Sequence, residues 1–404
     1  MKKIWVLILV LAMILGAVAC TSDTKPSDTA EPTPSTSGGE TQNTGETPVN
    51  TDAEAFDEYA RPRIVTDRPL KVAHMVEVLD TGAADRSAHQ MKIEAAHRGW
   101  DLYINNYGNA SAFSDAFRKM IADDYDVIIL HSVNSIASNK ELIAEARNAG
   151  IGVYCNDTQV VSGCIGAAAM PNGVASMEMF YRVASDYQYN LNNAIIYQAG
   201  TQLNCERTYP IKALSDGIVY PNIKNIVWED LSPFNATYQQ TVYEWTQTWL
   251  TQYGDEIDWI MTGWDACGES CAEAIIQAGD PHGEKTFVTG MDGDALAYDY
   301  IRNNTPYKYT YSQPFELYTH NICELVEQIQ VKGLNPGDEG CSISYVGQTI
   351  YATGIVTGPS NCPEVGANIH SVFDYYGGNP NDPDAWYNWD DGVGVYTRGE
   401  ATAE

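Results

Sequence analysis

Short apolar segments alternate with amphipathic stretches from residue 70 to residue 290, and this alternation constrains the fold more than any other feature of the sequence. The apolar segments have the length and composition of strands buried on both faces. The stretches between them carry apolar residues at the three- and four-residue spacing of a helix. Such a pattern predicts right-handed βαβ units and parallel sheets. Because it pauses between residues 160 and 172 and then resumes, we expect two similar α/β lobes instead of one long sheet.

The pattern gives an expected order of elements. The first array comprises predicted strands at 70–78, 102–105, 125–130 and 151–155, with helices at 83–97, around Phe117 and around Ile143. The second comprises predicted helices at 174–187, 206–217, 238–249 and through Ile275, with strands at 194–198, 226–229, 257–262 and 286–290. A strand at 307–312, a helix at 315–331 and strands at 342–345 and 350–356 follow.

Three of these strands run into a carboxylate or an amide. The strand at 151–155 continues into Asp157, the strand at 286–290 into Asp292, and the strand at 307–312 into Gln313. Ligands of open α/β sheets bind beyond the carboxyl ends of the strands, so we expect these side chains to line one cleft. The alternative is that both aspartates only cap helices. His131 also ends a strand, and we interpret it as a structural histidine.

The chain begins with the pattern of a secretory signal. Two lysines precede an apolar run from residue 4 to residue 18, and small residues precede Cys20. This ending resembles the lipobox of bacterial lipoproteins, in which the cysteine is lipidated and becomes the mature N-terminus. It implies a signal peptide over residues 1–20 and a lipid anchor at Cys20 on the outer face of the bacterial cytoplasmic membrane. Ordinary secretion without a lipid is the alternative.

Residues 21–67 are Ser, Thr, Pro, Gly, Glu and Asp with few large apolar groups, which predicts a disordered tether. Its mean reach is on the order of 35 to 40 Å. About 335 residues follow, a length that suits two lobes. The chain has 53 acidic and 23 basic residues and a net charge of −30, which argues against nucleic acid as a partner.

Eight cysteines follow Cys20, and an even number outside the cell permits disulfides. Sequence separation favours Cys155 with Cys164 or Cys341 with Cys362. Cys267 and Cys271 lie four residues apart on a predicted helix, and buried thiols or a disulfide explain them better than a metal does. The aspartates of the extension at 371–404 have two interpretations, a calcium site or a plain surface segment, and they are Asp382, Asp384, Asp390 and Asp391. We expect no metal and no cofactor.

Several local motifs carry a resemblance to a known family. They are Glu206-Arg-Thr-Tyr-Pro-Ile-Lys-Ala-Leu214, Gly263-Trp-Asp-Ala266, Thr289-Gly-Met-Asp-Gly293 and Ser312-Gln-Pro314. Over residues 68–356 the chain resembles the type I periplasmic binding proteins, the sugar receptors of ABC transporters, and among them the galactose/glucose and ribose binders. The resemblance implies two Rossmann-like lobes with parallel sheets and a three-segment hinge near Val160, Gln313 and residues 341–347. It places the N-terminal lobe at 68–160 plus 314–341 and the C-terminal lobe at 161–313 plus 342–370.

The resemblance also implies roles for individual residues. Arg207 reaches the sugar, Phe234 packs on its ring, and Asp292 is a ligand aspartate. The full implied binding set is Asp157, Arg207, Phe234, Trp264, Asp265, Asp292 and Gln313, and it includes no catalytic residue. Arg207 is alternatively a surface ion pair, and Phe234 and Trp264 are alternatively core aromatics.

The chain departs from the family at three places. Trp264 stands where the family has Asn, Ala168 stands where an aspartate is common, and residues 81–86 lack the usual aromatic.

The function implied is capture of a monosaccharide or similar polyhydroxylated molecule by hinge closure. A monomeric receptor would then deliver this sugar or polyol to an ABC permease and its ATPase. One alternative is a membrane-tethered sensor that presents its closed form to a receptor partner. Another is a glycoside-processing enzyme in which two carboxylates act as acid and base.

Overall fold

The computed structural model describes residues 60–77, 82–131, 140–188, 191, 193–198, 207, 224–231, 237–279, 285–364, 379 and 382–389. All of them belong to one compact unit, residues 55–404. Cys20, Cys205, Phe234, Asp390, Asp391 and most of the predicted helix at 206–217 lie outside the described residues. None of the described helices has the length and apolar character needed to cross a membrane.

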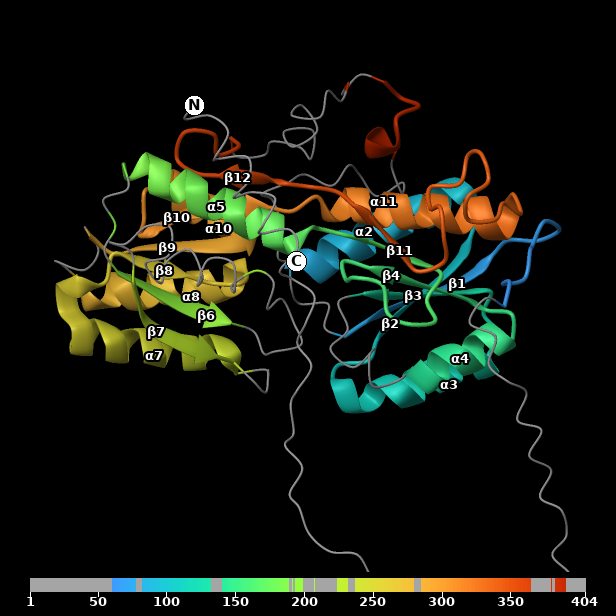
Figure 1. Cartoon of the computed structure of the whole chain (residues 1–404), viewed down its shortest axis with the longest axis horizontal. Helices are drawn as coiled ribbons and strands as arrows, with labels where there is room; N and C mark the ends of the chain where they lie inside the picture. Colours follow the sequence, from blue (N-terminus) through green and yellow to red (C-terminus); the bar gives the residue numbers. More distant parts are fainter. Residues whose placement is uncertain are drawn as a thin grey trace, which may run out of the picture. The chain divides into compact units, whose positions relative to one another are not determined.

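The first sheet is parallel throughout and has the strand order β11-β5-β4-β3-β1-β2. Its strands are β1 (Lys71–Val76), β2 (Asp101–Asn106), β3 (Val127–His131), β4 (Gly152–Asn156), β5 (Gly166–Ala169) and β11 (Gln348–Tyr351). Figure 1 shows α2 (Gly82–Arg98) and α11 (Phe315–Val326) on one face, with α3 (Phe113–Ala122) and α4 (Lys140–Asn148) on the other.

Successive side chains of a strand in this sheet enter different cores. Val72 packs in the same core as Met91 of α2, while Ala73 packs in the same core as Phe117 of α3. Because both faces are covered, both sets of alternating positions must be apolar, which explains the uninterrupted apolar runs in the sequence.

The second sheet has the order β12-β10-β9-β8-β6-β7, and only β12 pairs antiparallel. Its strands are β6 (Asn193–Gln198), β7 (Lys224–Asp230), β8 (Trp259–Met261), β9 (Phe287–Asp292), β10 (Tyr307–Ser312) and β12 (Ile355–Thr357). Helix α5 (Asn172–Asp186) covers one face, where Phe180 meets Trp259, and α7 (Tyr238–Tyr253) and α8 (Asp265–Ala278) cover the other (Figure 1). The predicted class, two α/β units built on parallel sheets, is confirmed.

Two of the three passages between the sheets lie later than the sequence predicts, while the one near Gln313 lies where it was expected. The passages lie after β5, after β10 and between β11 and β12, at about residues 170, 313 and 353. Expected lobe boundaries at 160 and 341 therefore need correction, because β5 and β11 pair in the first sheet. The predicted strand at 350–356 is two strands in different sheets. Between them Gly354 packs so closely on Ser312 that an added Cβ would lie 1.9 Å from the Ser312 carbonyl oxygen.

Other predicted elements also differ. No strand forms at 342–345, and α11 ends in a turn of π-helix over Glu327–Val331. Helix α10 (Ala295–Arg302) is not among the predicted helices, because its eight residues are too few to establish a helical period.

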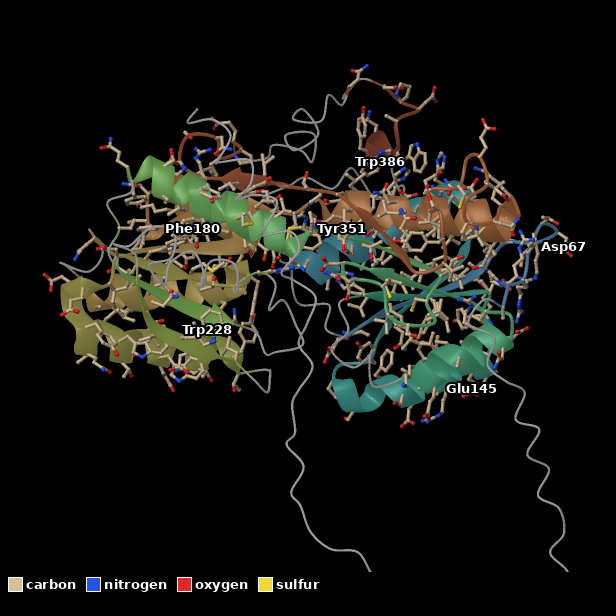
Figure 2. All side chains as sticks on the ribbon, viewed as in Figure 1. Asp67, Glu145, Phe180, Trp228, Tyr351 and Trp386 are labelled. Atoms are coloured by element: carbon tan, nitrogen blue, oxygen red, sulfur yellow. The ribbon has the colours of Figure 1, made fainter. Side chains whose placement is uncertain are left out.

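The described part of the C-terminal extension, 382–389, packs on helices that cover the first sheet. Trp386, labelled in Figure 2, stacks on His320 of α11 with ring centroids 4.4 Å apart. Trp389 stacks on His97 of α2 with ring centroids 3.5 Å apart. Asp382 accepts a hydrogen bond from the Asp384 backbone within this segment. Across the described residues, no three His, Cys, Asp or Glu side chains come together as metal ligands.

The seven described cysteines are free thiols. Cys155 and Cys164, which sequence separation favours as a pair, are hydrogen-bonded to each other, and that contact together with burial raises the pKa of the Cys164 thiol. Cys267 and Cys271 are fully buried on α8, as expected for structural thiols.

Candidate ligand-binding site

Asp292 is the centre of the candidate site, at the end of β9. Gln313 follows β10, and the two strands pair in parallel with Ser312 opposite Asp292, so their ends coincide. Gln313 Nε2 donates to Asp292 Oδ1 at 2.6 Å. The Asp292 backbone has a φ of 146°, a costly conformation for a residue with a side chain. Strain of this kind is often maintained at a binding site because it aims one side chain.

Arg207 approaches the same carboxylate. Its Nη1 lies 3.4 Å from Asp292 Oδ1 and donates to the Gly263 carbonyl at 2.9 Å, and its Nε donates to Asn172 Oδ1 at 2.9 Å. The residue is only 4 % exposed. The surface ion pair considered for Arg207 is therefore wrong, since this guanidinium is buried and held by three acceptors.

Asp265 lies behind this network. Its Oδ2 accepts from the backbone N–H groups of Gly293 at 2.7 Å and Asp294 at 2.8 Å. Its Oδ1 accepts from Tyr307 Oη at 2.6 Å and Thr310 Oγ1 at 2.7 Å. The side chain is fully buried, and these four donors occupy its acceptor sites. Asp265 therefore fixes the loop that follows Asp292.

Trp264 is half-buried immediately before α8. Its ring centroid lies 5.4 Å from that of Tyr238, and the two side chains are hydrogen-bonded. Burial raises the pKa of Tyr238 to about 12, and the charge of Asp292 adds to this shift, so Tyr238 is near the site. From the sequence, Tyr238 belongs to the apolar stripe of the predicted helix at 238–249, which indicates a core residue. Its position in the first turn of that helix was the only sequence signal for a role at the site.

The first sheet contributes a second set of residues. Asp157 follows β4 with a φ of 53°, and its backbone N–H donates to Ala168 O at 2.8 Å. The charge of Asp157 adds to the rise in the pKa of Asp292, which burial mainly causes. Asn156 lies opposite His131 in the register of β4 and β3. Through these strand ends the first sheet brings Asp157, Asn156 and His131 to one edge.

His74, His131 and Asn156 are buried, and each has at least one polar atom without a hydrogen-bond partner among the described residues. The rings of His74 and His131 are 5.6 Å apart and T-shaped, and no ring nitrogen of either has a hydrogen-bond partner among the described residues. Burial lowers the pKa of His131, although Asp157 opposes the shift. Asn156 Nδ2 donates to Thr319 Oγ1 at 3.0 Å, while its buried Oδ1 accepts from no donor within the described part of the chain.

Arg86 of α2 joins the two sets, and sequence reasoning missed it. Its Nε and Nη2 each donate to the Glu316 carboxylate at 2.8 Å. Its Nη1 donates to the Asp292 carbonyl and its Nη2 to the Gln313 carbonyl, each at 3.0 Å. Arg86 thereby ties two helices of the first sheet to the strand ends of the second.

Carboxyl groups dominate the electrostatics of the second-sheet side. Burial raises the pKa of Asp292 well above its usual range, and the Arg207 guanidinium opposes this rise. Burial, with the charge of Asp265 in addition, raises the pKa of Asp294 to about 7. Burial also raises the pKa of Glu269 to about 9.

The structure therefore brings Arg207, Asp292 and Gln313 into direct contact, with Asp157, Trp264 and Tyr238 close by and Asp265 as a support. Phe234 lies outside the described residues. A guanidinium, an amide and carboxylates at one place can donate and accept hydrogen bonds together, which is the chemistry needed to bind hydroxyl groups.

Comparison with known proteins gives one family match. The model described as "Periplasmic binding protein domain" matches residues 73–329. No curated protein matches the chain in sequence.

The fold is similar to solved structures at low identity. One is the periplasmic component of the arabinose ABC transporter of Shewanella sp. ANA-3, 17 % identical, covering 76 % of this chain and 94 % of that one, with a TM-score of 0.59. A glucose-galactose binding protein of Geobacillus stearothermophilus is 16 % identical over 74 % of this chain and 100 % of that one, with a TM-score of 0.61. A solute-binding protein of Bacillus halodurans C-125 with bound myo-inositol is 14 % identical over 74 % and 98 %, with a TM-score of 0.60.

Proposed function

This chain belongs to the periplasmic binding protein family, and from that premise we propose that it captures a monosaccharide or similar polyhydroxylated molecule and delivers it to an ABC importer. The observation that carries the proposal is the position of the Asp292 carboxylate, 2.6 Å from Gln313 Nε2 and 3.4 Å from Arg207 Nη1. Hydroxyl groups donate and accept at once, and this set does both. The arabinose and myo-inositol proteins with a similar fold support the same ligand class.

Hinge closure is the proposed mechanism. Three chain segments connect the two sheets, and each sheet contributes polar strand ends to the site. The ligand stabilises the closed state because only then do Asp157 on one side and Asp292 and Arg207 on the other contact it together. Closure also removes water, which strengthens each hydrogen bond and penalises a hydroxyl left without a partner.

The cellular location of the protein is part of the proposal. A lipid on Cys20 holds the mature chain at the outer face of the cytoplasmic membrane, and the segment at 21–67 gives the folded body the reach to meet a permease. Partition of the intact chain into a detergent phase, lost in Cys20→Ala, is the expected result. Equal partition of both forms would exclude the anchor.

Thermal unfolding with a panel of monosaccharides and polyols tests the binding function. A ligand at one hundred times its Kd is expected to raise the free energy of unfolding by about 2.7 kcal/mol. Arg207→Ala and Asp292→Ala should lose this stabilisation. The matched control is Arg182→Ala, which removes a partly exposed ion pair on α5, 2.7 Å from Asp186, and should keep it.

Two results would count against this function. Undiminished ligand stabilisation in both Arg207→Ala and Asp292→Ala would exclude the site, since neither group could then contact the ligand. Turnover of a glycoside by the purified protein, with loss of turnover in Asp292→Ala, would favour an enzyme instead.

A further inference from the structure

The second-sheet side of the site holds more acid than base. Burial is the main cause of the raised pKa values of Glu269, Asp292 and Asp294. The charge of Asp265 adds to all three shifts, and that of Asp157 adds to the shift of Asp292. Of the described guanidinium groups near them, Arg207 contacts Asp292. Arg86 forms two hydrogen bonds to Glu316, and its charge opposes the rise that burial causes in the pKa of Asp294. Within the described residues, the acidic groups therefore exceed the basic ones at this place.

The buried amide of Gln313, beside this cluster, indicates that a hydrogen-bond donor is missing from the site. Gln313 is fully buried, and its Nε2 donates to Asp292 Oδ1 at 2.6 Å. The other end of that amide, Oε1, has no hydrogen-bond partner in the described part of the protein. A buried acceptor of this kind costs about 1 to 3 kcal/mol until a donor reaches it.

Two carboxyl oxygens of the cluster share this condition. Glu269 Oε1 and Asp294 Oδ1 are buried and also have no partner among the described residues. Asp294 lies against the start of α2, where a Cβ on Gly82 would be 2.0 Å from Asp294 Oδ1. Gln313 Oε1 is an acceptor in every state, and the two carboxyl oxygens accept whenever their groups are ionised, so the site suits a ligand that donates and that favours ionisation.

A cation on the ligand meets this demand better than hydroxyl groups alone. An ammonium group brings three donors and a positive charge to a place where burial already disfavours the charged carboxyls. A metal ion does not fit, because no three ligating side chains converge among the described residues. With an uncharged sugar the buried carboxyls would keep their protons, whereas a cationic ligand would favour their ionised forms, which accept hydrogen bonds from it.

We propose that the ligand is a polyhydroxylated cation, an amino sugar or amino polyol whose ammonium group lies beside Asp292 and Asp294. The inference rests on the proposed sugar-binding function and narrows its ligand class. Asp294 is then the residue that separates the amino ligand from its neutral counterpart, while Arg207 and Gln313 contact the hydroxyl groups that both share.

Matched ligand sets test the proposal by calorimetry and thermal unfolding at pH 6.5. The sets are galactosamine, galactose and galacturonate; glucosamine, glucose and glucuronate; and glucamine, glucitol and gluconate. Within at least one set the amino member is expected to bind about tenfold or more tightly than the neutral one, a difference of about 1.4 kcal/mol. The acidic member should bind most weakly.

Variants assign the preference to a residue. Asp294→Asn is expected to reduce the ratio of amino to neutral affinity about tenfold. Asp255→Asn, an exposed acid in the turn at Gly254–Glu256, is the control and should leave the ratio unchanged. This control also corrects for the small change in overall net charge.

The failure of this inference is distinguishable from failure of the proposed function. If neutral sugars bind as tightly as their amino counterparts, or the acidic members bind best, the cationic ligand is excluded and sugar capture stands. If all nine compounds leave the protein unstabilised, the inference is overturned as well. Sugar capture falls with it only when the wider panel of neutral monosaccharides and polyols is also without effect.

Discussion

The two sides of the candidate site differ in how their buried polar groups are satisfied. On the second-sheet side, Asp265 accepts four hydrogen bonds and Asp292 is contacted by both Arg207 and Gln313. On the first-sheet side, the ring nitrogens of His74 and His131 are buried with no partner among the described residues. Asp265 and Asp292 are therefore held by protein partners, although Gln313 Oε1, Glu269 Oε1 and Asp294 Oδ1 beside them have none among the described residues, whereas the two histidine rings of the first-sheet side have no partner at either nitrogen.

This difference separates stability from binding. A group with several protein partners leaves each of them unsatisfied when it is removed, so its loss costs stability. A buried polar group without partners is itself a cost, so its replacement by an apolar side chain of similar size costs nothing or stabilises. The two sides also carry opposite pH dependences, because one buries acids and the other buries imidazoles.

The largest effect on stability is expected for Asp265, whose carboxylate accepts four hydrogen bonds. Asp265→Ala leaves the Asp294 backbone N–H and the hydroxyls of Tyr307 and Thr310 without an acceptor, and among the described residues the Gly293 N–H keeps Thr310 Oγ1 alone. We expect the free energy of unfolding to fall by about 3 kcal/mol or more, measured by urea denaturation. Asp255→Ala, at an exposed acid, should stay within about 0.5 kcal/mol. A similar small loss in both variants would mean that the second-sheet side is not internally supported.

The second largest effect is on stability at high pH, and it concerns Glu269. Burial raises the pKa of Glu269 to about 9 from an ordinary value near 4.5, so the native state binds a proton that the unfolded chain releases. The stability from this group is fully present below about pH 4.5 and is lost as the pH rises toward 9. The slope is at most about 1.4 kcal/mol per pH unit. Glu269→Gln should flatten this loss between pH 6 and 9 in urea titrations, and an unchanged slope would exclude a buried neutral carboxyl.

Much of the fold and part of the candidate site could be predicted from the sequence, because these features depend on residues that are close together along the chain. The apolar runs of β3 and β4, and that of β1 apart from His74, follow from burial on both faces. The polar residues at the ends of β4, β9 and β10 placed Asp157, Asp292 and Gln313 at strand ends. Both features depend on spacing along the chain, which the sequence displays directly. The class of fold and the edge of each sheet that carries the site follow from them.

The remaining features depend on contacts that spacing does not show. Strand β5 reads Gly-Ala-Ala-Ala, which carries no β-branched or aromatic signal, so the first passage between the sheets was placed too early. Arg86 bonds to residues 206 to 230 positions away, and no local pattern marks such a partner. Asp265 follows a strand, as Asp157 does, yet its donors come from two other segments, the loop after β9 and strand β10, and only the fold separates its supporting role from that of Asp157 and Asp292.

A smaller effect is expected at low pH. Burial lowers the pKa of His74 well below 6.5, and that of His131 is also lowered, so the unfolded chain binds protons that the native state excludes. Their contribution to stability is present above about pH 6.5 and is lost as the pH falls below it. His74→Leu should make the decline between pH 6.5 and 5 shallower by at most about 1.4 kcal/mol per pH unit. An equally steep decline in this variant would show that other groups cause it.

The smallest expected effect has the opposite sign to that of Asp265→Ala. At pH 7.5 His74 is neutral and fully buried, and neither ring nitrogen has a partner among the described residues. Leucine fits an apolar environment without that cost, so His74→Leu should raise the free energy of unfolding by about 1 kcal/mol. Urea denaturation measures the change, and His320→Leu is the control, because His320 Nδ1 lies 2.9 Å from Glu94 Oε1 and its loss should destabilise. A loss of stability in His74→Leu as large as in the control would mean that ordered water satisfies the ring, and the contrast between the two sides of the site would then disappear.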